Sequence, residues 1–323
     1  MYRKVSAILI PTIIAAGIIA YMLFRVWGDF LKALQHIVPE WLAAAVAICL
    51  VAWVLRGWRY RRILKSLGYP VKLAMSTACI FVSQTANVIV PARLGDFVRV
   101  FILRHEHTAT YSEGVSSVVV ERIFDIFTVA ILGAIALPFI LNVPSWLYII
   151  VIVPIVAGLI FFIFLFCMGK CSAENRIFRI VLTMLHEIRK ASLSMRSLTI
   201  LGVSSIVIWL FDVFVCAAVV LMLGQNIPFP VIVLAIVVGN LVKAVPLTPG
   251  GMGTYELALA GVFTLAGVPW EIAFLIGFID HLIKNLVTLA GGIVSIYYFG
   301  DWVVPSIRSA FNSKVTGGTS SEH

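Results

Sequence analysis

The chain has 323 residues, of which 61% are hydrophobic and 12% are charged, and its mean hydropathy is +1.06. This composition lies far from that of water-soluble domains and excludes an ordinary soluble enzyme. The formal net charge is +9, but lysine and arginine gather in short segments between apolar runs. The charge therefore indicates membrane topology, and nucleic acid is not an expected partner.

Apolar runs long enough to cross a bilayer recur along the sequence. A helix needs roughly 20 residues to span about 30 Å of hydrocarbon, and it satisfies its backbone hydrogen bonds internally. We therefore expect an all-α polytopic membrane protein, with six full spans at residues 5–24, 38–55, 115–138, 146–168, 198–223 and 271–298. These spans form a single transmembrane domain over residues 1–300, and the tail at 301–323 is expected to be cytoplasmic and partly disordered.

Basic residues predict the orientation. The loops at 56–72 and 170–197 are rich in lysine and arginine, and the positive-inside rule places both in the cytoplasm. Six crossings then put the N- and C-termini in the cytoplasm of a protein of the cell membrane. Residues 170–197 also mix Leu185, Ile188 and Leu193 with basic residues, which predicts an amphipathic helix at the membrane surface.

Two further apolar segments contain helix breakers partway along. Residues 73–91 lead into Ala92-Arg93-Leu94-Gly95-Asp96, and residues 231–246 lead into Leu247-Thr248-Pro249-Gly250-Gly251. Proline removes a backbone donor, and such breaks are tolerated at membrane depth only where protein or water surrounds them. We expect two broken or re-entrant helical hairpins, called here the first break and the second break.

The two breaks lie in similar sequence contexts, roughly 155 residues apart. Trp53 and Arg56 match Trp209 and Asp212, and Asn87 before the first break matches Asn240 before the second. This spacing predicts diverged repeats over about residues 38–168 and 198–298. The topology makes them an inverted repeat, an architecture of many transporters, whose site is expected where the breaks converge.

The first break carries candidate ligands for an anionic headgroup: Asn87, Arg93, Asp96 and Arg99. A helix N-terminus offers free N–H groups, and a guanidinium provides a planar fork that suits phosphate. The competing interpretation is that Arg93 and Arg99 extend to the membrane interface while Asp96 supports the first helical turn.

The second break supplies Thr248, Gly250, Gly251 and Glu256 as further binding candidates. Its unwound backbone would allow close approach to a substrate. Lys243, just before the break, would neutralise Glu256 or bind an anion. In the alternative interpretation the glycines form a plain turn and Glu256 stabilises the first turn of a helix.

Ionisable residues also lie inside the predicted spans, where charge is costly unless it is paired or solvated. Glu121, Arg122 and Asp125 are candidates for substrate binding, although Arg122 and Asp125 are spaced to form a structural ion pair. Asp212 and Asp280 are candidate proton or ion sites. Asp280 has a local partner four residues on, whereas Asp212 needs a partner from another helix.

Together these motifs resemble the lysylphosphatidylglycerol synthase/flippase-like transmembrane family, an uncharacterised membrane family of bacteria and archaea. The resemblance is carried by the first break up to Arg99, by Glu121-Arg122 with Asp125, and by the second break up to Glu256. It implies an amphipathic substrate with a phosphate. Many relatives carry Glu where this chain has Asp96, which keeps the charge on a shorter arm. The family's synthases continue into a large soluble domain, so lipid aminoacylation by this chain alone is not expected.

The leading hypothesis is a flippase-like transporter of an anionic phospholipid or a polyprenyl-phosphate-linked glycolipid, and not an enzyme. The alternatives are an ion-coupled transporter of a small solute, a scaffold for a glycosyltransferase or other lipid-modifying enzyme, and a membrane-embedded enzyme acting on lipid phosphates. Membrane lipids, such an enzyme and further copies of the chain are the candidate partners. No cofactor or metal is expected, because the sequence has no Gly-Lys-Ser/Thr phosphate loop, and its scattered cysteines and histidines lack metal-ligand spacing.

Overall fold

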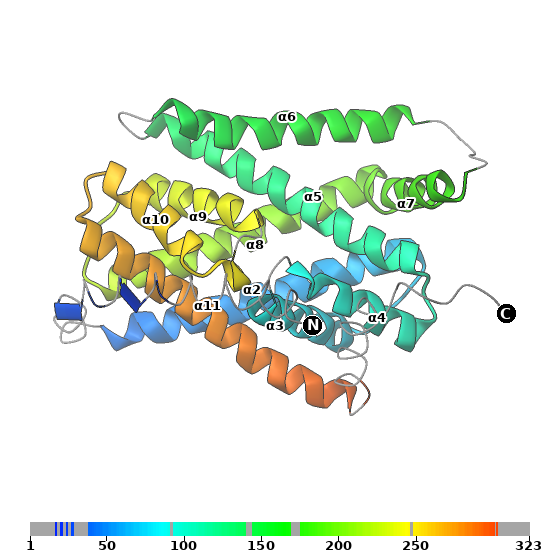
Figure 1. Cartoon of the computed structure of the whole chain (residues 1–323), viewed down its shortest axis with the longest axis horizontal. Helices are drawn as coiled ribbons and strands as arrows, with labels where there is room; N and C mark the ends of the chain where they lie inside the picture. Colours follow the sequence, from blue (N-terminus) through cyan, green and yellow to red (C-terminus); the bar gives the residue numbers. More distant parts are fainter. Residues whose placement is uncertain are drawn as a thin grey trace.

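The computed structural model describes residues 38–90, 93–139, 144–168, 175–245, 248–300 and 302, with isolated helical positions between 17 and 28. These residues form helices and no strands, which confirms the predicted all-α class (Figure 1). The helices are α2 (Pro39–Leu67), α3 (Leu73–Ile89), α4 (Asp96–His107), α5 (Tyr111–Ala136), α6 (Ser145–Cys167), α7 (Arg176–Ser192), α8 (Met195–Met222), α9 (Phe229–Ala244), α10 (Thr254–Leu265) and α11 (Trp270–Phe299). Short 3-10 turns lie at Leu137–Phe139 (η2) and Pro249–Gly251 (η3).

Four of the described helices are long and apolar enough to cross a membrane, namely α2, α6, α8 and α11. Helix α5 covers the predicted span at 115–138 but carries Glu121, Arg122 and Asp125 along its length. The predicted span at 5–24 and the tail at 301–323 lie outside the described residues, apart from isolated positions. The amphipathic segment forms α7, which packs against α5.

The predicted boundary after residue 55 is wrong. Helix α2 continues to Leu67, so Arg56 and Arg59 lie within it and not in a cytoplasmic loop. Arg59 is 1% exposed. Their charges are tolerated because carboxylates from α5 and α8 pair with them, which a hydropathy window along one helix does not register.

Both predicted breaks interrupt the helices as expected. Helix α3 ends before the first break and α4 begins after it, and α9 and α10 stand in the same relation to the second. The breaker residues 91–92 and 246–247 themselves lie outside the described part of the chain. Each pair of short helices packs together, so each break forms a helical hairpin.

The helix pattern recurs in two sets, α2–α5 and α8–α11. Helices α2 and α8 are antiparallel neighbours, because Val38 at the start of α2 bonds to Met222 at the end of α8, whereas Arg59 bonds to Ser205. Helix α3 packs against α11, and its counterpart α9 packs against α5. Antiparallel packing of equivalent helices is the arrangement of an inverted repeat. Helices α6 and α7 lie between the two sets in the sequence, and α6 runs along one edge of the bundle (Figure 1).

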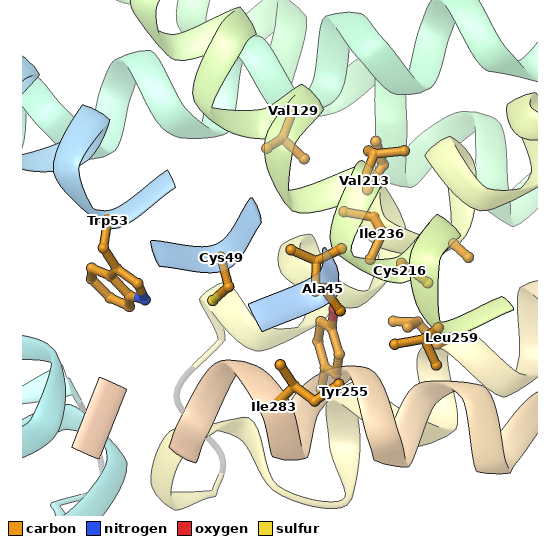
Figure 2. Packing of buried hydrophobic residues seen from close by; sticks show 14 of the residues in the cluster. Ala45, Cys49, Trp53, Val129, Val213, Cys216, Ile236, Tyr255, Leu259 and Ile283 are labelled. Carbon is orange, nitrogen blue, oxygen red and sulfur yellow. The ribbon is translucent and has the colours of Figure 1, made fainter. Parts of the chain in front are cut away.

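The apolar core joins the two sets. Figure 2 shows Ala45 and Cys49 of α2 beside Tyr255 of α10 and Ile283 of α11, with Cys216 of α8 close by. These residues are buried in one continuous cluster. The core therefore holds α2, α8, α10 and α11 together on the apolar side of the polar cavity described next.

Candidate functional site

A cavity of about 140 Å³ lies where the two breaks face each other. Its walls come from α2, α3, α5, α8, α9, α10 and α11, and from both breaks. The predicted site residues that line it are Asn87, Arg93, Glu121, Arg122, Asp125, Asp212, Lys243, Thr248, Gly250 and Gly251. Residues more than 160 positions apart in sequence thus share one polar chamber.

The other four predicted residues stand behind this wall. Asp96, Arg99, Glu256 and Asp280 do not line the cavity, and each is bonded to at least one residue that does. They form a supporting layer, which fixes the rotamers of the lining groups without facing the cavity.

Asp96 anchors the supporting layer of the first break. The Arg122 guanidinium donates to both Asp96 carboxylate oxygens at 2.8 Å, and Asn87 Nδ2 donates to Oδ1 at 2.9 Å. The preceding Gly95 makes this contact feasible, because a Cβ there would lie 2.4 Å from the Ser83 carbonyl oxygen. Asp96 thus lies behind the cavity wall and positions Asn87 and Arg122, which line the cavity.

Arg99 takes neither of the two predicted roles. Its side chain is 0% exposed, so it neither extends to the interface nor faces the cavity. Nη1 donates to Glu121 at 2.6 Å, and Nη2 contacts Asp96 at 3.2 Å. A fully buried guanidinium needs carboxylate partners of this kind, so Arg99 has a structural role.

The predicted local pair of Arg122 and Asp125 is replaced by longer-range pairs. Arg122 binds Asp96, and Asp125 accepts from Arg59 of α2 at 2.6 Å and from Trp209 of α8 at 3.0 Å. Asp125 thereby ties α5 to α2 and α8, whereas Glu121 of the same helix pairs with Arg99 of α4 and lies 3.6 Å from Arg59 of α2.

The second set of helices holds a parallel network of charges. Asp280 pairs with Lys284 at 2.9 Å, as the i,i+4 spacing predicts, and accepts from the Tyr255 hydroxyl at 2.7 Å. Asp212 has partners from two other helices, Arg56 at 2.9 Å and Lys284 at 3.7 Å. The expected need of Asp212 for a distant partner is met.

Glu256 is held by His281 instead of Lys243. Glu256 Oε1 lies 2.7 Å from His281 Nδ1, and Oε2 accepts the Gly253 N–H at 2.7 Å. Lys243 Nζ contacts the opposite ring nitrogen of His281 at 3.0 Å. Gly251 leaves room for the lysine, because a Cβ at this positive-φ position would lie 2.6 Å from Lys243 Cγ. The predicted direct neutralisation of Glu256 by Lys243 is wrong, since the histidine stands between them.

Arg93 and Lys243 are distinct among the cations that line the cavity. Within the part of the chain that the structure describes, neither has a carboxylate oxygen within 4.0 Å, whereas Arg56, Arg122 and Lys284 are all paired. Arg93 is held at a φ of 52° and reaches across to donate to the Lys243 backbone carbonyl at 3.4 Å. Each of the two hairpins therefore places one cation at the cavity whose charge is not compensated by an ion pair.

Sequence reasoning missed several lining residues. Arg56, His281 and Lys284 are the charged or titratable ones, and Gln84, Asn240, Tyr255 and Asn285 add polar groups. The repeat alignment did set Arg56 against Asp212, which are now seen as direct partners. That alignment was the one signal that could have placed Arg56 in the site. Among the described residues, no group of three or more His, Cys, Asp or Glu residues is arranged to hold a metal ion.

Comparison with known proteins identifies the family. The lysylphosphatidylglycerol synthase TM region matches residues 8–292. Glycosyltransferase AglD of Haloferax volcanii is 32% identical over 83% of this chain, and the chain spans 50% of the length of AglD. A UPF0104 membrane protein of Methanothermobacter thermautotrophicus is 24% identical over 92% of this chain and 95% of its own length.

A UPF0104 membrane protein of Methanocaldococcus jannaschii is 27% identical over 65% of this chain and 92% of its own length. No solved structure matches. The protein is a multi-pass membrane protein with a lipid-related role. By its match over residues 8–292, the chain belongs to the family of the lysylphosphatidylglycerol synthase TM region.

Proposed function

We propose that the protein is a flippase-like transporter that moves an anionic lipid across the cell membrane and is not an enzyme. The substrate class is a lipid whose headgroup carries a phosphate, either a phospholipid or a polyprenyl-phosphate-linked glycolipid. The observation that supports it is the pair Arg93 and Lys243, two cations from opposite hairpins that share one cavity and have no carboxylate partner among the described residues.

The charge balance of the site favours an anion. In the cavity wall and the layer behind it, with His281 counted as neutral, cations outnumber carboxylates by one: Arg56, Arg59, Arg93, Arg99, Arg122, Lys243 and Lys284 face Asp96, Glu121, Asp125, Asp212, Glu256 and Asp280. Five of these cations pair with five of these carboxylates within the protein, and the sixth carboxylate, Glu256, contacts His281. An isolated charge in a low-dielectric site is costly, and a phosphate oxygen would compensate Arg93 and Lys243 together.

The size of the cavity suits a headgroup alone. A volume of about 140 Å³ equals that of roughly five liquid waters, which is too small for acyl or prenyl chains. The chains would remain in lipid while the headgroup crosses through the protein. Alternating opening of the two hairpins would expose the site to one side and then the other, as in transporters built from inverted repeats.

The names of AglD and of the UPF0104 proteins do not identify a partner of this chain. We extend the proposal to a partner enzyme. A glycosyltransferase or other lipid-modifying enzyme would produce or consume the transported lipid on one face of the membrane. The basic loops predict that both termini lie in the cytoplasm. The partner enzyme would act on the membrane face at which its own substrate is present.

A reconstituted-liposome assay tests the proposal. Movement between leaflets is followed for labelled phosphatidylglycerol and, separately, for a labelled polyprenyl-phosphate hexose, with intact protein and with Arg93→Ala and Lys243→Ala. Each variant is expected to lose at least tenfold in rate, because each removes one of the two unpaired cations. Arg196→Ala is the matched control: this exposed arginine at the start of α8 does not line the central cavity.

The two lipids distinguish the two substrate sources. Movement of one lipid alone identifies its class, and movement of both indicates recognition of the shared phosphodiester. Folded intact protein that moves neither lipid contradicts the proposal and favours solute transport or a scaffolding role. Full activity in both cavity variants also contradicts it.

A further inference from the structure

A line of three hydrogen-bonded groups leads from the second hairpin into the cavity. Glu256 of α10 is 2% exposed and contacts His281 Nδ1, and His281 Nε2 contacts the Lys243 ammonium of α9. The histidine and the lysine line the cavity, whereas the glutamate lies behind them. The line thus connects a buried carboxylate to one of the two cations proposed to bind the headgroup.

The two contacts of the His281 ring assign its protons. A lysine ammonium has only donors, so its contact requires His281 Nε2 to act as the acceptor. The remaining ring proton then lies on Nδ1 and is donated to the Glu256 carboxylate, which already accepts from Gly253. In this hydrogen-bond arrangement the His281 ring is neutral.

The charges around His281 come from each helix that packs near it. Lys243 on α9 and Glu256 on α10 contact the ring, and the Tyr255 ring lies beside it, tilted by 39°, with ring centroids 4.6 Å apart. On α11 itself Asp280 and Lys284 pair with each other, and on α2 and α8 Arg56 and Asp212 pair with each other. Helix α3 presents the uncharged Gln84 and Asn87, and the first break presents Arg93.

In this arrangement the protonation of His281 depends on whether the positive charge beside it is compensated. The ion pairs on α2, α8 and α11 are internally compensated. Lys243, which contacts the ring and whose backbone carbonyl accepts from Arg93, is therefore the positive charge that opposes a proton on His281. An anion bound to those two cations cancels this opposition. Glu256, which contacts the ring, would then be the counter-ion of a protonated His281.

We propose that His281 takes up one proton when a phosphodiester headgroup binds at Arg93 and Lys243, so that lipid and proton cross the membrane together. This inference rests on the proposed function and adds the coupling ion. By linkage, the anion raises the affinity of His281 for a proton, and the proton raises the affinity of the cavity for the anion by the same factor. One phosphodiester carries one negative charge, so its movement with one proton transfers no net charge.

The test uses proteoliposomes with labelled phosphatidylglycerol in one arm and a labelled polyprenyl-phosphate hexose in the other. A phosphodiester is chosen because it does not itself titrate near neutral pH. A gradient of one pH unit is imposed in either direction, and a membrane potential is imposed separately with potassium and valinomycin. The expected result is accumulation in the leaflet toward which protons flow, up to about tenfold, with no response to the potential.

His281→Gln is the decisive variant. Its amide can donate to Glu256 and accept from Lys243, which preserves both hydrogen bonds, but it cannot take up a proton. The ratio of rates under opposite pH gradients is expected to fall to about one in this variant. His186→Gln is the matched control, because His186 lies on α7, bonds to Leu182 of its own helix and does not line the cavity. It should respond as the intact protein does.

The outcomes separate this inference from the proposed function. Lipid movement that ignores the pH gradient, follows the opposite gradient, or keeps its gradient response in His281→Gln overturns proton coupling while the flippase proposal stands. Absence of movement of both lipids by folded protein overturns both.

Discussion

Arg56 on α2 and Asp212 on α8 form an ion pair in which Nη2 lies 2.9 Å from Oδ1, and they occupy matching positions in the two sets of helices. The contact therefore joins the two sets directly. Both residues also line the cavity. The junction of the repeats and the wall of the site are thus made by the same two side chains.

Arg56 and Asp212 are expected to couple energetically. Arg56→Gln leaves Asp212 with the more distant Lys284, and Asp212→Asn leaves Arg56 without a carboxylate within 4.0 Å. The double variant should be more stable than the sum of the single losses predicts, with a coupling free energy of about 1 kcal/mol or more. Reversible unfolding in detergent checks this, and strictly additive losses would show that the pair contributes nothing.

Glu121 should be essential for stability and not only for transport. Glu121→Gln removes the closest counter-charge of Arg99, whose side chain is 0% exposed, and a broken buried pair typically costs about 3–5 kcal/mol. The free energy of unfolding should fall by about that amount. Exposed Glu106→Gln is the control and should change it by less than about 0.5 kcal/mol. Equal effects of the two variants would contradict the assigned role of the Arg99 pair.

Gly251→Ala should impair the site while the helices remain intact. The added Cβ would lie 2.6 Å from Lys243 Cγ at a φ of 79°, so Lys243 must move away from its present position. We expect a loss of lipid movement comparable to that of Lys243→Ala. The control is Gly261→Ala within α10, where an added Cβ has no neighbour within 4 Å. A fully active Gly251→Ala protein would show that the position of Lys243 does not matter.

The first turn of α5 should weaken in acid. Burial alone would raise the pKa of Glu113, but hydrogen bonds from Thr110 and Tyr69 outweigh it and hold the pKa below its ordinary value of 4.5. Such a group stabilises the fold above its unfolded pKa, and the contribution is lost as the pH falls through the folded value. The intact protein should melt at a higher temperature than Glu113→Gln at pH 7, and the difference should shrink below about pH 4. A difference independent of pH would exclude this role.

Helix type and broken segments could be predicted because they depend on local sequence. Apolar length sets a span, and the clusters of proline and glycine at the two breaks interrupt the helices there, so α6, α8, α11 and both hairpins lie close to their expected positions. The end of α2 could not be predicted in this way. Its continuation past residue 55 depends on Asp125 and Asp212, which lie far along the chain and compensate Arg59 and Arg56.

The sequence by itself determined a helical membrane protein with two breaks and a set of ionisable residues that lipid would not tolerate unpaired. Only the tertiary structure decided which of those charged residues form ion pairs with each other. Arg99, Arg122 and Asp125 are paired across helices, whereas Arg93 and Lys243 are left facing the cavity. The physical reason is that an ion pair forms only between side chains a few ångströms apart. In a folded bundle, helix packing brings two side chains that close together, and spacing along the chain does not.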